Sequence, residues 1–157
     1  MPDLSDLPDV GRSPGAYGRG VRSPWQQRIP LEADREYVAL ASLIPPRSCS
    51  ATWRLFQGSR AVTAQLRETP GVVGFSLLAR PWRKQYATLS IWLDETSLAA
   101  FASSPPHRDL MASLGPEMAP TAFTRWTTRG ADGRPSWREA LRRLDAVPTI
   151  PSADGRS

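Results

Sequence analysis

The sequence predicts one α+β domain in which strands and helices follow one another in the order β-α-β-β-α-β. Three observations predict this order. The segment at 37–44 is apolar on both faces, as in a strand that is buried on both sides. Two alternating segments, 71–79 and 85–93, are separated only by a short basic connection. Helical segments with capping residues follow the first and third strands, and the domain is expected at residues 35–146 of the 157.

The first strand, YVALASLI, is followed by two prolines that end it. A helix from about residue 51 to 68 comes next, because apolar positions recur at helical spacing, and Ser48 or Ser50 is expected to cap it. The main stripe of this helix consists of Leu55, Ser59, Val62 and Leu66. Pro70 and Gly71 are expected to end it.

The two faces of the third strand carry different kinds of side chain. Tyr86, Thr88, Ser90 and Trp92 share one face, and Ala87, Leu89, Ile91 and Leu93 share the other. The aliphatic face is expected to pack against a helix, and the aromatic and hydroxyl face suits the wall of a partly wet pocket. The connection RPWRK, residues 80–84, is short enough to be a hairpin, which makes the second and third strands antiparallel.

The second helix is expected to consist of two parts. Asp94 or Thr96 caps the first part, and the two prolines at 105–106 separate it from HRDLMASLGPEM. The segment 121–130 returns to strand alternation. A final helix, SWREALRRL, has Ser136 at its N-cap position.

The two ends of the chain have the composition of tails. Residues 1–34 contain five prolines and four glycines with few apolar residues, so a disordered or loosely packed segment is expected there. Tyr17 and Trp25 are the exceptions, and either could pack against the domain or against a partner subunit. Residues 147–157 are expected to form a second tail.

The composition argues against several classes of protein. The net charge is +5, but the arginines are dispersed among acidic residues, so no nucleic-acid partner is expected. The single cysteine, Cys49, excludes an internal disulfide and fits a reducing cytoplasm. No apolar run approaches the roughly 20 residues of a membrane helix, and the start of the chain lacks the features of a signal peptide. A cytoplasmic protein without a membrane partner is therefore expected.

The order β-α-β-β-α-β is the ferredoxin-like order, in which helices cover one face of a four-stranded sheet. Because the first two strands are apolar on both faces, the second face should also be buried. The same face of a second subunit is the expected cover, which predicts a homodimer whose two sheets close into an α/β barrel.

The segment from Tyr86 to the last helix resembles the dimeric α/β-barrel superfamily that includes the antibiotic-biosynthesis monooxygenases. The resemblance covers roughly residues 36–145 and is closest to a bacterial group without an assigned function. It depends on a strand that ends in Trp92, a helix with Phe101, the sequence SPPHR before Met111, and the final PSW helix. Members of this superfamily include cofactor-free oxygenases of polyketide phenols, haem-degrading oxygenases, isomerases and cyclases.

The well-understood oxygenases of this kind use an Asn on the first strand and a Trp, often with a His, on the second helix. This chain contains no asparagine, and Ser42 is the polar side chain within its first strand. Phe101 takes the place of the Trp, and His107 is the counterpart of the His.

His107 is the predicted catalytic residue, because a neutral imidazole can accept a proton or bind haem iron. The alternative is that it only packs against and caps its own helix. Trp92, Tyr86 and Trp126, together with Ser90 and Phe101, are predicted to bind a flat substrate or, alternatively, to form plain core. Arg125 either holds an anionic group or faces solvent. No zinc-ligand spacing, phosphate-binding loop or nucleophile elbow is present, so no metal is expected except haem iron.

Three functions remain open from the sequence. The first is a monooxygenase-like protein that binds a small hydrophobic or aromatic molecule, with a cofactor-independent oxygenation or proton transfer. The second is a haem protein with His107 as axial ligand. The third is a ligand-binding or interaction module without catalysis.

Overall fold

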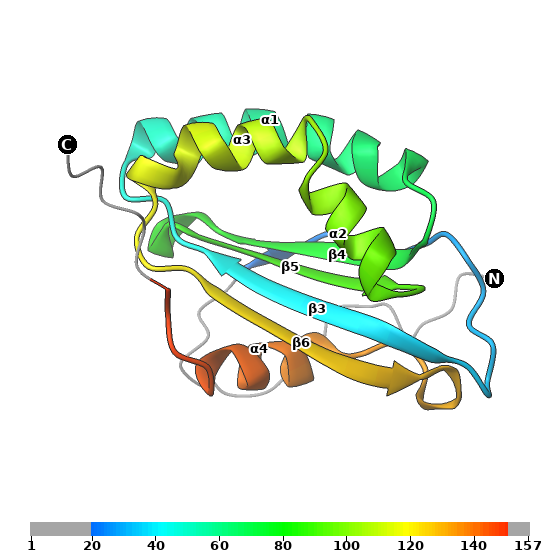
Figure 1. The fold of residues 1–157 in the computed structure, drawn as a ribbon. Helices are drawn as coiled ribbons and strands as arrows, with labels where there is room; N and C mark the ends of the chain where they lie inside the picture. Colours follow the sequence, from blue (N-terminus) through cyan, green and yellow to red (C-terminus); the bar gives the residue numbers. More distant parts are fainter. Residues whose placement is uncertain (1–19, 151–157) are drawn as a thin grey trace, which may run out of the picture.

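The computed structural model of the chain describes residues 20–150. Tyr17 and the outer parts of both expected tails, residues 1–19 and 151–157, lie outside the described residues. Within the described part, one antiparallel sheet carries helices on both of its faces (Figure 1). The predicted α+β class and its element order are confirmed.

The four main strands lie side by side in the order β4-β5-β3-β6, so the first strand of the predicted motif is central. Two short strands near the N-terminus pair with β4 and extend the sheet on that side. The bounds are β1 Val21–Arg22, β2 Gln26–Gln27, β3 Glu36–Ile44, β4 Val72–Arg80, β5 Gln85–Trp92 and β6 Ala122–Arg129. This strand order is ferredoxin-like, as predicted.

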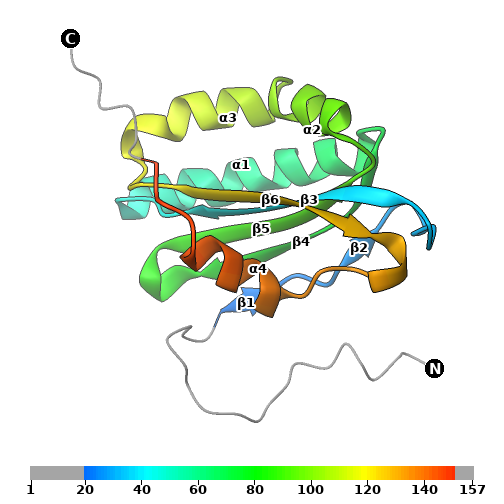
Figure 2. The ribbon, with the colours of Figure 1, turned by 60° about the horizontal axis from the view of Figure 1, so that its bottom comes forward.

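Three helices cover one face of the sheet, and the fourth lies on the opposite face (Figures 1 and 2). They are α1 Cys49–Glu68, α2 Glu95–Ala102, α3 His107–Leu114 and α4 Trp137–Asp145. The predicted caps are present: Ser48, Asp94 and Ser136 each accept a backbone N–H from the first turn of α1, α2 and α4. Single 3₁₀ turns occupy Pro81–Arg83, Gly115–Glu117 and Gly130–Asp132, the first of them in the predicted β4–β5 hairpin.

The alternation in β5 divides the core into two layers. Trp92 packs with Leu66 and Phe101 under α1 and α2, so the aromatic and hydroxyl face lies on the three-helix side. Leu89 packs with Leu141 of α4 on the other side. The aliphatic face thus receives a helix as expected, but that helix is the last one in the chain.

Helix α4 lies on a part of the sheet that is lined with alanines. Ala41, Ala87 and Ala122 come from three neighbouring strands and form one buried cluster with Leu141 and Leu144 of the helix. Small side chains let a helix approach a sheet closely, and α4 fills that space with apolar residues at spacings of three and four.

The N-terminal segment covers the rest of the same face. The ring of Trp25 packs against the cluster of Tyr37, Val73 and Ile91. The hydroxyl of Ser76 donates a hydrogen bond of 2.9 Å to the carbonyl of Ser23. Residues 20–31 therefore differ from the loosely packed tail expected for residues 1–34, because Trp25, Ile29 and Leu31 pack on the apolar surface of the sheet.

This coverage changes the basis of the predicted barrel dimer. The face expected to meet a second sheet is covered by α4 and residues 20–31 of the same chain (Figure 2). Ala39, Ala41, Val73 and Ile91 on that face are fully buried without any partner. The apolar character of these strands is thus explained within one subunit. No helix within residues 20–150 has both the length and the apolarity needed to cross a membrane.

The contact between Trp25 and Gly74 provides a test of this second layer. A Cβ on Gly74 would lie 2.5 Å from the ring of Trp25, so the Gly74→Ala variant must displace the indole. We expect the free energy of unfolding to fall by about 1–3 kcal/mol, as for other overpacked cores. Urea unfolding measures this change.

Gly115→Ala is the matched control, because a Cβ there meets no atom within 4 Å and the backbone is already helical. Its stability should stay equal to that of the wild type or rise slightly. Equal stabilities of the two variants would contradict the packing of residues 20–31 on β4.

Candidate functional site

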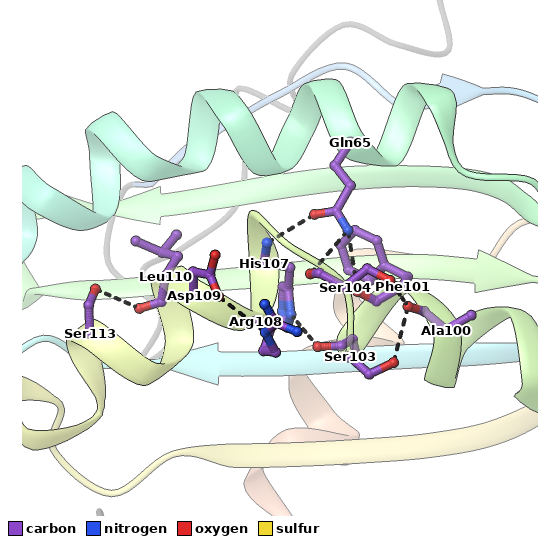
Figure 3. A network of polar contacts seen from close by, with 11 residues as sticks. Gln65, Ala100, Phe101, Ser103, Ser104, His107, Arg108, Asp109, Leu110 and Ser113 are labelled. Carbon is purple, nitrogen blue, oxygen red and sulfur yellow. Dashed lines mark hydrogen bonds and ion pairs between the residues drawn. The ribbon is translucent and has the colours of Figure 1, made fainter.

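His107 lies at the start of α3 and contacts the ring of Phe101, which in turn contacts the ring of Trp92. The centroids of His107 and Phe101 are 4.8 Å apart, and those of Phe101 and Trp92 are 5.1 Å apart. The three residues come from α3, α2 and β5, so this group exists only after the helices pack on the sheet. We call it the ring series; Figure 3 shows its outer two members.

The inner end of the ring series is a closed core. The indole N–H of Trp92 donates a hydrogen bond of 2.9 Å to the hydroxyl of Ser90. Trp92 is 1% exposed and Ser90 5%, so these two side chains are not open to a ligand in this structure. Phe101, 7% exposed, borders a cleft, and His107, which is half-buried, is the most exposed member of the ring series. Trp92 and Phe101 therefore support the imidazole from below.

The environment of His107 favours its neutral form. Burial lowers the pKa of the imidazole below 6.5, and a hydrogen bond to the carbonyl of Ala102 opposes this shift more weakly. Nδ1 lies 3.2 Å from that carbonyl oxygen. Because a carbonyl can only accept, Nδ1 carries the proton, and Nε2 keeps its lone pair. Among residues 20–150 no hydrogen bond to Nε2 is present, so this atom is chemically able to accept a proton or bind a metal.

Tyr86 lies on the same face of the sheet as the ring series but at the other end of β5. It packs with Ile44, Leu55 and Leu114, while Trp92 belongs to a different cluster. Desolvation raises the pKa of the phenol, so it stays protonated at neutral pH. The structure therefore does not bring Tyr86 together with His107.

Arg125 and Trp126 lie on opposite faces of β6. The guanidinium of Arg125 is 2.7 Å from the carboxylate of Glu95, and both side chains are exposed. Trp126 packs in the cluster under α4, with the guanidinium of Arg143 4.6 Å from its ring centroid. Trp126 and Trp92 lie on opposite faces of the sheet, because they pair with Ala39 and Val38, which are neighbours on β3. The structure therefore does not bring these two predicted substrate-binding residues together.

Gln65 is part of the site and was not predicted from the sequence. Its side-chain oxygen accepts the backbone N–H of His107 at 3.0 Å, and its amide nitrogen donates to the carbonyls of Phe101 at 3.3 Å and Ser104 at 3.4 Å (Figure 3). Sequence reasoning missed this residue because nothing in the helical pattern distinguishes it from Gln57, an exposed glutamine on the same helix.

Three solved structures have a similar fold. Rv0793 from Mycobacterium tuberculosis superposes with a TM-score of 0.52 at 19% identity, over 57% of this chain and 92% of the other. An antibiotic-biosynthesis monooxygenase superposes with a TM-score of 0.50 at 11% identity, over 58% and 95% of the two chains. A candidate antibiotic-biosynthesis monooxygenase from Nitrosomonas europaea gives 0.51 at 14% identity, over 60% and 91%.

The chain has the fold of the antibiotic-biosynthesis monooxygenases. The predicted resemblance is confirmed at the level of fold. No protein-family model matches the sequence, and no curated protein matches it either. At these identities the monooxygenase fold is what is shared, and an activity does not follow from it.

The site differs from the monooxygenase pattern in a specific way. The helix-side polar residue of β3 is Ser42, and its hydroxyl bonds the hydroxyl of Thr88 on the neighbouring strand. The aromatic residue on α2 is Phe101, and the indole in contact with it comes from Trp92 on β5. An indole is therefore present next to Phe101, but it belongs to a strand and not to the second helix.

The structure contains a cleft beside the ring series. It has a volume of about 510 Å³ and lies between the end of α1 and α2, where Gln65, Phe101 and Ser104 belong to its lining. A smaller cavity of about 210 Å³ lies on the other face of the sheet, next to Leu43 and Leu141. His107 lines neither of them. Residues 20–150 contain no group of three side chains suited to hold a metal ion.

His107 is the only histidine, so its titration can be followed without interference. We expect its NMR signal to titrate below 6.5 in the folded protein and near 6.5 in the urea-unfolded chain, because burial disfavours imidazolium. Since the folded chain then binds the proton less tightly, the free energy of unfolding should decrease as the pH falls below about 6.5.

The decrease should level off once the pH is below the pKa of the folded state. In the His107→Gln variant this part of the pH dependence should be absent. A folded-state titration at or above 6.5 would show that the ring is solvated or paired with an acid, contrary to the observed packing.

Proposed function

We propose that this monooxygenase-fold protein binds a small hydrophobic or aromatic molecule next to His107 and that His107 acts as a general base. The observation that carries the proposal is the state of the imidazole. Nδ1 is engaged by the carbonyl of Ala102, the ring lies against Phe101, and burial keeps it neutral. A base that is neutral and held in one tautomer is prepared to accept a proton at its other nitrogen.

The reaction class is cofactor-independent oxygenation or a related proton transfer. In the oxygenation, Nε2 of His107 takes a proton from an acidic C–H of a phenolic substrate, and the resulting carbanion is delocalised over its ring. The carbanion reduces dioxygen and forms a C–O bond, and loss of water from the peroxide converts the CH₂ group to a carbonyl. One substrate and one O₂ thus give one ketone and one H₂O, with no other oxidant.

The surrounding residues have supporting roles in this proposal. Phe101 fixes the plane of the imidazole, and the buried Trp92–Ser90 pair holds Phe101 in turn. The cleft lined by Phe101 and Ser104 offers space for a molecule of small-ligand size. Thr96 and Ser97 also line this cleft, and their hydroxyl groups can bond those of a phenolic compound.

Turnover of an anthrone, a tricyclic phenol with an acidic CH₂ group, tests the base. We expect oxygen uptake by the wild type and a loss of about 10²-fold or more in kcat for His107→Ala, the usual cost of removing a general base. Arg108→Ala is the control, because this neighbour of His107 is exposed and its guanidinium pairs with Asp109. Full turnover by His107→Ala would remove the assignment.

Haem binding with His107 as axial ligand is the second possibility, because the lone pair of Nε2 is open to a metal. Haem would supply oxygen-activating iron, but the cavity that held it would have to contain His107, because the whole macrocycle must fit around Nε2, and neither cavity described above has His107 in its lining. A substrate bound in the cleft beside Phe101 would need to bring only one C–H group to Nε2. We therefore expect no Soret band that depends on His107 when the protein is titrated with haem. A Soret band that is lost in His107→Ala would establish the haem protein instead.

The third possibility, a ligand-binding or interaction module, shares the binding step with the first. It is distinguished by a wild type that binds the aromatic compound without consuming oxygen.

The homodimer stays a prediction for this chain. Because α4 and residues 20–31 cover the predicted sheet face, a dimer in this form of the chain would have to use a different surface.

A further inference from the structure

We infer that Gln65 is the positioning residue of His107: its side-chain amide holds the connection between α2 and α3 and thereby orients the imidazole. The effect on turnover rests on the proposed function, but the positioning itself does not. Gln65 comes from α1, and it is the partner on which both ends of the connection converge (Figure 3).

The start of α3 requires a hydrogen-bond acceptor from outside. The first N–H groups of a helix have no partner within the helix, and a side chain at the N-cap usually accepts one of them. At α3 the N-cap position is Pro106, which has no side-chain acceptor. Gln65 takes this role from another helix, since its Oε1 accepts the N–H of His107.

The end of α2 receives two hydrogen bonds from the same side chain. The last carbonyls of a helix also lack partners within it. The Nε2 group of Gln65 donates to the carbonyls of Phe101 and Ser104, which lie on either side of the end of α2. The carbonyls of Phe101 and Ser104 also accept the backbone N–H groups of Ser104 and Arg108. One amide thus bonds a donor on α3 and two carbonyls at the end of α2, which neither a carboxylate nor an apolar side chain can do.

These bonds hold the two groups that contact the imidazole. The ring of Phe101 and the carbonyl of Ala102 both belong to the last turn of α2, while the imidazole is carried by the first residue of α3. Gln65 ties the backbone of Phe101 to the backbone of His107. These hydrogen bonds set how the imidazole lies relative to the Phe101 ring and the Ala102 carbonyl, and hence the direction in which Nε2 points.

Gln65→Leu and Gln57→Leu are the variants to compare, because they make the same change on the same helix at a bonded and at an exposed position. The first readout is hydrogen exchange of the His107 amide, whose only hydrogen bond in the described part of the chain is to Gln65. We expect exchange to become at least about tenfold faster in Gln65→Leu and to stay unchanged in Gln57→Leu.

The second readout is the pKa of His107, measured on its single NMR signal. In Gln65→Leu the ring should gain water, and since desolvation is the larger cause of the shift, its pKa should rise toward 6.5. Gln57→Leu should keep the wild-type value. A folded Gln65→Leu protein with unchanged amide exchange and unchanged pKa would overturn the inference.

Gln65→Glu keeps the inference testable if Gln65→Leu does not fold. The carboxylate can still accept the His107 N–H, but it cannot donate to the carbonyls, and it adds a negative charge near the ring. We expect the amide to stay protected and the pKa of His107 to rise above the wild-type value. An unprotected amide with a wild-type pKa would count against Gln65 as the positioning residue.

These readouts separate two kinds of failure. If the wild type does not consume oxygen with any anthrone, the proposed function fails, and the NMR results still decide the role of Gln65. If the wild type is active, kcat of Gln65→Leu should fall at least about tenfold with a shifted pH profile, while Gln57→Leu keeps full activity.

Discussion

The structure depends on the burial of both faces of the central strands. β3 is hydrogen-bonded to β5 on one side and to β6 on the other, so its side chains have only the two directions above and below the sheet. Those directions lead into separate apolar clusters, under α1–α3 and under α4. Exposure of one face of such a strand would be unfavourable, because each aliphatic side chain left in water loses about 1.5–3 kcal/mol of the free energy gained by burial.

The two faces of the sheet are buried by different kinds of side chain. On the three-helix side, large rings and leucines fill the space, and the series Trp92–Phe101–His107 extends from core to surface. On the other side, alanines on three strands make room for α4, and the glycine at position 74 makes room for Trp25. The first layer holds the candidate site, and the second isolates the sheet from a partner.

The site combines a rigid interior with an adjustable connection. Each aromatic contact in the ring series contributes on the order of 0.5–1.5 kcal/mol beyond its buried area, so the plane of Phe101 is well determined. His107 itself sits where α2 ends and α3 begins, and its orientation depends on hydrogen bonds to Gln65 and Ala102. The chemistry proposed for His107 thus depends on a few polar bonds at the edge of a well-packed core.

Much of the fold followed from local patterns in the sequence. The alternation of β5, the caps at Ser48 and Ser136, and the hairpin at 80–84 depend only on neighbouring residues, and all are present. The solitary histidine also drew attention to His107, because its side chain is the one that titrates near neutral pH.

Tertiary structure decided the rest. The sequence indicated that both faces of the sheet are buried, but not whether α4, Trp25 or a second subunit covers the second face, since each can offer apolar side chains. It could not place Trp126 apart from Trp92, because the assignment of a face to a layer depends on which helices pack there. Nor could it distinguish Gln65 from Gln57. The role of Gln65 depends on backbone groups of α2 and α3 that only tertiary packing brings within hydrogen-bond distance.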